Sequence, residues 1–160
     1  MTTPDASGET PAKITDLPPG LAPVVILVEP QLAENIGMTA RAMANFGLSE
    51  LRLVNPKNGW PKKGVREAAS GATHVLDRAT IFGSVAEAIA DCRYVLATTA
   101  RERGQMKRVF APEAAMGELV AREGQRTAVM FGRERVGLTN DEVSLADAII
   151  TFPVSPDFPS

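Results

Sequence analysis

The sequence predicts an α/β protein in which a mostly parallel sheet carries helices on both faces. Three observations predict this fold class. The chain has 160 residues, the length of one domain, and 44% of them are hydrophobic, as in ordinary globular proteins. Apolar runs alternate about five times with segments of helical spacing. The first run, VVILVE at 24–29, is continuously apolar up to its last residue, as in strands buried on both faces.

Residues 1–22 form a separate zone rich in Pro, Thr, Ser and Gly. Such a segment cannot bury enough apolar surface to offset the entropy that is lost on ordering. We therefore expect a disordered N-terminal arm at 1–22 and one folded domain at 23–160.

In the first half of the domain, a helix over 34–46 is expected after the strand at 24–29. Its apolar residues recur at helical spacing and can share one face: Ile36, Ala40, Met43 and Phe46. Gly47 suits the left-handed position that ends a helix. The pattern then predicts a strand at 51–55, a loop at 56–72 with a short helix at 65–70, and a short strand at 74–77.

The second half continues the alternation. Pro112 opens a helix at the first-turn position that proline favours, and Thr139 or Asn140 can cap a later one. The expected elements are a helix at 83–92, a strand at 93–99, a polar loop at 100–110, a helix at 112–123, a strand at 127–131, a helix at 139–146 and a strand at 148–152. Ligands of open parallel sheets bind outside the carboxyl ends of the strands, which makes four loops candidates for chemistry, those after Glu29, Thr99, Phe131 and Phe152.

Composition excludes several classes of protein. One cysteine and one histidine exclude a disulfide framework and Cys-based or paired-His metal sites, so we expect no metal. No apolar run approaches the ~20 residues that span a membrane, and the N-terminus lacks the basic start and apolar core of a signal peptide. We therefore expect a cytoplasmic enzyme or binding domain. The segment Gly132–Thr139 resembles a phosphate-binding P-loop, but Leu138 stands where the lysine is required.

Two of the candidate loops carry polar residues with a possible role. Asn35 sits at a helix start and Arg41 follows six residues later, so both can point toward the carboxyl end of the first strand; a helix cap and a solvated arginine are the alternative. Thr98 and Thr99 offer hydroxyls at a strand end. Residues 101–108 then carry four positive charges and one negative charge, which suits a phosphate backbone; a solvated loop is the alternative.

The third informative loop is Gly-Arg-Glu-Arg-Val-Gly-Leu-Thr, directly after Phe131. Gly132 allows a ligand to approach the backbone closely, and Glu134 places an acid at the expected functional edge. A plain charged turn is the alternative.

These loops, in this order, resemble the SpoU-type 2′-O-ribose RNA methyltransferases of the SPOUT superfamily, and most closely their TrmJ-like group. The first motif corresponds to residues 35–47, the second to 131–140 and the beginning of the third to 153–160. The TrmJ-like segments Thr98–Arg101 and Leu53–Pro56 also match, so that the resemblance covers residues 23–160. It implies an α/β trefoil-knot fold, a methyltransferase domain over 23–160 and S-adenosylmethionine as the cofactor.

The resemblance also implies roles for individual residues. The catalytic positions are Arg41, Asn35, Glu134 and Ser160. The positions that bind the cofactor are Thr98, Thr99, Ala100, Gly132, Phe152, Pro159 and Ser160. A guanidinium normally stays protonated, so we expect Arg41 to hold a phosphate through its fork and to favour the alkoxide, rather than to act as the base.

The implied substrate is RNA, most specifically nucleotide 32 of tRNA. The net charge is −2, so local basic segments must bind it, and the candidates are Lys62, Lys63, Arg66, Arg101, Arg103, Lys107 and Arg108. A homodimer would present both sets twice. Two alternatives stay open: ribosomal RNA as the substrate, and a catalytically silent module that binds RNA or senses the cofactor.

The third motif departs from the family pattern. In the family it continues with Ser-Leu-Asn and a helix that completes the knot, and TrmJ-like proteins carry a further helical extension, whereas this chain stops at Ser160. We therefore expect a fragment that lacks the knot helix and the extension, with an incomplete knot and cofactor pocket.

Overall fold

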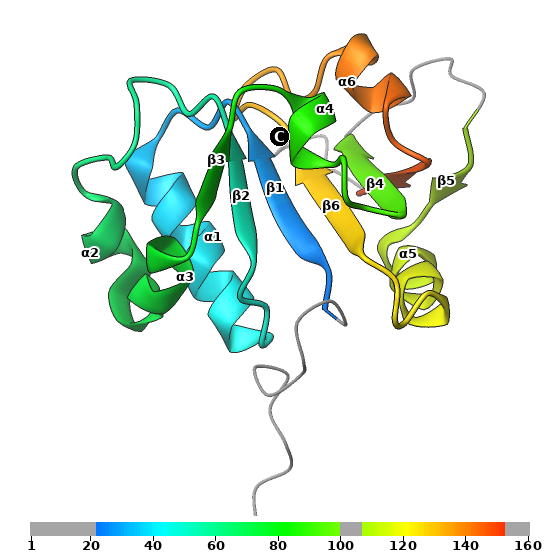
Figure 1. Cartoon of the computed structure of the whole chain (residues 1–160), viewed down its shortest axis with the longest axis horizontal. Helices are drawn as coiled ribbons and strands as arrows, with labels where there is room; N and C mark the ends of the chain where they lie inside the picture. The colour runs from blue at the N-terminus through cyan, green and yellow to red at the C-terminus, as the bar shows by residue number, and fades with distance from the viewer. Residues whose placement is uncertain (1–21, 100–106, 153–160) are drawn as a thin grey trace, which may run out of the picture.

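The computed structural model describes residues 22–99 and 107–152, and in them a seven-stranded sheet of order β3-β2-β1-β6-β4-β7-β5 (Figure 1). Every neighbouring pair is parallel, which confirms the predicted sheet. The strands are β1 Val24–Val28, β2 Leu51–Val54, β3 Thr80–Phe82, β4 Tyr94–Thr99, β5 Val109–Phe110, β6 Thr127–Phe131 and β7 Ala148–Thr151. The carboxyl ends of all of these strands therefore meet at one edge of the sheet, the upper edge in Figure 1.

Helices cover both faces of the sheet, as predicted. They are α1 Ala33–Asn45, α2 Val65–Ala69, α3 Thr73–Asp77, α4 Val85–Ala88, α5 Pro112–Ala121 and α6 Asn140–Ser144, with a 3-10 turn at Ser70–Ala72. Pro112 opens α5, Thr139 caps α6 through its side chain, and Gly47 takes the left-handed conformation after α1. These local signals were correctly predicted because each depends only on neighbouring backbone.

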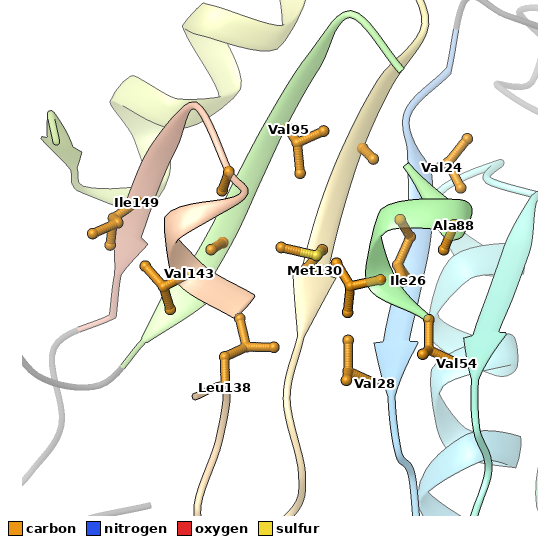
Figure 2. Packing of buried hydrophobic residues seen from close by; sticks show 14 residues of the cluster. Val24, Ile26, Val28, Val54, Ala88, Val95, Met130, Leu138, Val143 and Ile149 are labelled. Atoms are coloured by element: carbon orange, nitrogen blue, oxygen red, sulfur yellow. The ribbon is translucent and has the colours of Figure 1, made fainter. Parts of the chain in front are cut away.

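Alternate residues of the strands form separate cores on the two faces. On one face, Val25 and Leu27 of β1 pack under α1, α2 and α3, while Leu96 and Val129 pack under α5. On the other face, Ile26 and Met130 pack against Ala88 of α4 and Val143 of α6. Figure 2 shows these side chains on the side of the sheet where α4 and α6 lie.

Three predictions of local structure were wrong. The strand expected at 74–77 is the helix α3, which continues the turn after α2 and buries Val75 and Leu76 beside α1. The edge strand β3 was missed, because only three residues pair with β2 and Ile81 stays 43% exposed. Phe46 does not join the buried face of α1: it follows the helix and is 67% exposed.

Several predictions lie outside the described residues. They concern most of the N-terminal arm, the basic loop at 100–106 and the third motif at 153–160, which includes the expected knot. Part of the loop expected at 100–110 is described, and its last two residues correct that expectation: Val109 and Phe110 form the edge strand β5 beside β7.

Candidate functional site

The carboxyl edge of the sheet brings together the segments that the sequence singled out. β1 lies between β2 and β6, and β4 lies on the far side of β6, so chain order reverses direction beside β1. Ligands of parallel sheets bind at such a switch point. The segment after β1, the loop after β6 and the ends of β4 and β7 all meet at this edge, where Leu27 pairs in register with Phe131, and Thr99 with Thr151.

The loop after β6 is a tight turn that folds back on itself. The backbones of Arg133 and Gly137 exchange two hydrogen bonds, at 3.2 and 2.9 Å. A Cβ on Gly132 would lie 2.2 Å from the carbonyl carbon of Gly137 and 2.3 Å from the nitrogen of Leu138. Gly132 therefore allows the loop's own backbone to approach closely, whereas the expected approach of a ligand stays a prediction.

Arg133 anchors this turn to two other elements. Its guanidinium contacts the Glu29 carboxylate after β1, with an Nη2–Oε2 distance of 2.9 Å. It also donates two hydrogen bonds, of 2.9 and 2.8 Å, to the two carboxylate oxygens of Glu142 in α6. Hydrogen bonds from Arg133 lower the pKa of both carboxylates below their ordinary values, so both stay ionised near neutral pH.

Glu134 joins the second motif to the first. Its carboxylate accepts hydrogen bonds from the backbone N–H groups of Gln31, at 3.1 and 2.9 Å, and of Leu32, at 2.9 Å. Leu32 occupies the N-cap of α1 and has no side chain that can cap it, so Glu134 supplies the acceptor from the other motif. Partial burial would raise the pKa of Glu134, but the bonds from Leu32 and Gln31, with a further one from the Asn35 side chain, lower it.

The structure thus brings Asn35 and Glu134 together, while Arg41 lies farther along α1. Arg41 is exposed and forms no ion pair with any described residue. The helix itself is seated by Gly37, where a Cβ would lie 2.5 Å from the Cβ of Ala68 and 2.6 Å from the carbonyl oxygen of Val65. The glycine of the first motif therefore lets α1 and α2 cross closely, which fixes the helix that carries Asn35 and Arg41.

Hydroxyl groups line the adjacent ends of β4 and β7. Thr98 donates a 2.9 Å hydrogen bond to the carbonyl oxygen of Met130, and Thr99 is buried beside Thr151. Among the described residues, Thr151 Oγ1 is a buried oxygen without a hydrogen-bond partner. Phe152, which follows, is 40% exposed. This corner therefore has unused polar capacity beside an accessible ring. The other predicted cofactor positions, Ala100, Pro159 and Ser160, lie outside the described residues.

The basic residues fall into different environments. Arg66 pairs with Asp77 at 2.8 Å, so its charge is partly neutralised, and the Lys62 ammonium bonds to the carbonyl oxygen of Lys57. Lys63 is exposed, and Arg108 lies 4.8 Å from the ring centroid of Phe110. Lys107 is half-buried, and Arg101 and Arg103 lie outside the described residues.

Sequence reasoning missed the anchoring residues Arg133, Glu29 and Glu142. The available signal was an arginine on either side of Glu134 in one short loop. The partners of Arg133 could not be inferred from it, because Glu29 lies 104 residues away in sequence. Within the described residues, no cluster of three or more His, Cys, Asp or Glu is placed to hold a metal ion. Over the same ranges, no helix has the length and apolar character to cross a membrane.

Comparison with known proteins matches this arrangement to one family. The model of the SpoU rRNA Methylase family matches residues 22–160. A tRNA (cytidine/uridine-2′-O-)-methyltransferase TrmJ of Yersinia pestis is 39% identical over 138 residues, which are 85% of this chain and 53% of that protein. The chain spans 53% to 60% of the length of the first curated relatives.

Solved structures agree. The crystal structure of TrmJ from Z. mobilis ZM4 superposes with a TM-score of 0.83 at 54% identity, covering 87% of this chain and 62% of that one. The SpoU methyltransferase AviRb from Streptomyces viridochromogenes, solved in complex with the cofactor AdoMet, shares the fold with a TM-score of 0.64 at 19% identity, covering 92% of this chain and 55% of that one. From the family model, the relatives and the shared fold together, this chain belongs to the SpoU rRNA methylase family.

Proposed function

We propose that this chain is the catalytic domain of an S-adenosylmethionine-dependent RNA 2′-O-ribose methyltransferase that acts on tRNA. The observation that carries the proposal is the link between the two motifs: the Glu134 carboxylate binds the backbone that starts α1 and also the Asn35 side chain. The link lies at the switch point of a parallel sheet, where ligands bind. The TrmJ names of the relatives support tRNA as the substrate.

The polar corner at the ends of β4 and β7 fits the cofactor. S-adenosylmethionine has ribose hydroxyls, an amino acid group and a flat adenine, and the unpartnered Thr151 Oγ1 and the partly exposed Phe152 offer it a hydrogen bond and an apolar surface. Thr98, Thr99 and the backbone of Gly132 complete the described part of this set. When bound, the cofactor supplies an electrophilic methyl group on a positively charged sulfur.

Glu134 and Arg41 have different roles in the proposed reaction. Glu134 already accepts backbone hydrogen bonds and has a lowered pKa, which makes it a poor proton acceptor and suits it to holding α1 in place. Arg41, exposed and without an ion pair among the described residues, is free to clasp an RNA phosphate and to stabilise the ribose oxygen as its proton leaves. Much of the acceleration comes from holding the two reactants in line.

RNA binding is assigned to the basic side chains, with the exposed Lys63 and Arg108 and the half-buried Lys107 contributing most. Arg66 contributes less because of its pairing with Asp77. We also propose a cytoplasmic homodimer, since tRNA is found in the cytoplasm and α1 exposes Met38 to 58% beside the site. Changing Lys107 and Arg108 to Ala should weaken tRNA binding and flatten its salt dependence. An unchanged salt slope would remove this segment from the RNA surface, and sedimentation velocity tests the dimer.

Methyl transfer from labelled S-adenosylmethionine to defined RNAs tests the function directly. We expect label in tRNA transcripts, at a ribose 2′ oxygen of nucleotide 32. The description of the matching family favours ribosomal RNA as the second candidate, and label in ribosomal RNA alone would establish it. Binding of cofactor and RNA without any transfer would instead indicate the silent module.

The role of Arg41 has its own test. Arg41→Lys keeps the positive charge but loses the planar fork that grips a phosphate through two hydrogen bonds. We therefore expect this variant to lose almost as much turnover as Arg41→Ala. Turnover at the level of the unmodified chain in Arg41→Lys would contradict the role.

A further inference from the structure

Arg133 connects three segments at the carboxyl edge of the sheet. It belongs to the turn after β6, and it reaches Glu29 after β1 and Glu142 in α6, with a further 3.2 Å hydrogen bond from Nη1 to the carbonyl oxygen of Gly137. The side chains are partly buried, at 20% exposure for Arg133, 26% for Glu29 and 16% for Glu142. Charged hydrogen bonds at such sites are less screened than those on the open surface.

Each of the two glutamates belongs to a backbone segment that borders the site. Glu29 has a positive φ of 50°, which is uncommon for residues other than glycine or asparagine. It leads directly into the segment that Glu134 binds. Glu142 accepts a 2.8 Å hydrogen bond from the backbone N–H of Thr139 and so closes a capping box at the start of α6.

One cation therefore compensates two anions that face each other across the loop. If the guanidinium is removed, Glu29 and Glu142 are left as like charges in a partly buried site. Among the described residues, the cation that then remains paired with Glu29 is the more distant ammonium of Lys57, at 3.6 Å. Repulsion would then push the end of β1 away from α6. The turn between them would lose its anchor, and Gly132 and Glu134 lie within that turn.

We propose that Arg133 is a positioning residue for the cofactor: it fixes the turn at 132–138 against the end of β1, so that the site at the switch point is already assembled before the cofactor binds. This inference rests on the proposed function and deepens it. Arg133 acts through Glu29 and Glu142, and the structure shows its guanidinium fully engaged with them.

The test compares four variants by calorimetric titration of S-adenosylmethionine, with thermal unfolding recorded for each. Arg133→Met should weaken cofactor binding by about tenfold, because Glu29 and Glu142 are left as uncompensated like charges that push the turn out of position. Arg133→Lys keeps the positive charge but loses the planar fork of the guanidinium, so its cofactor affinity should lie between those of Arg133→Met and the unmodified chain. In Arg133→Met with Glu29→Gln, the repulsion is gone, and much of the affinity should return.

Arg135→Met is the matched control. It removes the same type of side chain from the same turn, but Arg135 is exposed and forms no ion pair with a described residue. Its cofactor affinity should equal that of the unmodified chain.

Three results would overturn the inference. The first is a folded Arg133→Met variant that binds the cofactor as tightly as the unmodified chain. The second is a double variant as weak as Arg133→Met although its unfolding temperature has recovered. The third is the absence of cofactor binding both by this chain and by one extended through the expected Leu-Asn and the following helix. That result would overturn the proposed function as well, whereas the first two leave that function standing. If Arg133→Met does not fold, Arg133→Lys and the double variant decide.

Discussion

Two networks of arginines and carboxylates brace opposite edges of the same sheet. At the amino edge, Arg52 of β2 forms a two-point contact with Asp91, at 2.6 and 2.9 Å, and Arg126 joins them to Glu50. At the carboxyl edge, Arg133 joins Glu29 and Glu142. The chemistry is the same, but Arg52 lies inside a strand and under a helix, whereas Arg133 lies in a loop beside the candidate site.

The amino-edge network is a structural brace. The Arg52 side chain is only 7% exposed and also donates a 2.6 Å hydrogen bond to the carbonyl oxygen of Ala88, which ends α4. Burial, with the negative charge of Asp91, raises the pKa of the Cys92 thiol in this network to about 11, so the thiol stays protonated and is a poor nucleophile. An ion network therefore indicates function only by its place in the fold, and the variants below test that distinction.

The largest effect is expected at α1, which can be displaced from the carboxyl edge without changing a charge. Gly37→Ala places a methyl group 2.6 Å from the carbonyl oxygen of Val65, so α1 and α2 must move apart. We expect a loss of about 3 kcal/mol in the free energy of unfolding, at the upper end for overpacking, measured by urea denaturation. Cofactor affinity should fall too, because Glu134 binds the start of the same helix.

Gly117→Ala on α5 is the control for this variant. Nothing lies within 4 Å of a Cβ there, and alanine in a helix is favoured over glycine by roughly 0.5–1 kcal/mol. This control should be slightly stabilised and bind the cofactor normally. A Gly37→Ala variant as stable as the control would show that the helix crossing is loose.

The second effect separates the two networks. Asp91→Asn leaves the buried guanidinium of Arg52 with the partly exposed Glu50 as its remaining carboxylate. We expect a loss of about 2 kcal/mol in unfolding free energy, less than the ~3–5 kcal/mol for a fully buried pair, because Asp91 is half-exposed. Cofactor affinity should not change. A matching loss of affinity would mean that both edges serve the site.

Asp77→Asn is the control for that prediction. It breaks the exposed pair with Arg66, in which both side chains are more than half exposed. Solvent and salt screen such a pair, so its loss should leave unfolding by urea unchanged.

The sequence predicted what depends on local pattern. The parallel sheet, the cap at Thr139 and the carboxyl edge as the candidate site follow from apolar runs, capping residues and strand direction. The end of α1 could not be predicted as well from local pattern. Phe46 has helical spacing with Met43, but the helix stops at Asn45, so the Phe46 ring is turned to solvent.

Long-range contacts and short elements could not be predicted in this way. The segment Thr73–Asp77 has β-branched residues, yet its packing against α1 makes it a helix. The pairing of Arg133 with Glu29 depends on β1 and β6 being neighbours, which no local pattern reveals. The motif predicted Glu134 as an acid at the site, and only the structure shows that its carboxylate accepts hydrogen bonds from backbone N–H groups.

The smallest effect is a difference in pH dependence between the two edges. Arg133 lowers the pKa values of Glu29 and Glu142, and Arg52 lowers that of Asp91 much further. A depressed carboxyl pKa contributes stability above the unfolded-state value, about 4 for these groups, and this contribution is lost as the pH falls through the folded-state value. On acidification, the carboxyl edge should therefore loosen while the amino edge still holds.

We expect cofactor affinity to decline below about pH 4.3 before the far-ultraviolet circular dichroism changes. Glu142→Gln sharpens this test, because glutamine can still close the capping box with Thr139 but neither titrates nor pairs with Arg133 as an anion. Its affinity should be lower at pH 7 and should decline less on acidification. Loss of cofactor affinity and of secondary structure at the same pH would mean that the two networks open together. The carboxyl edge would then have no pH dependence separate from that of the whole fold.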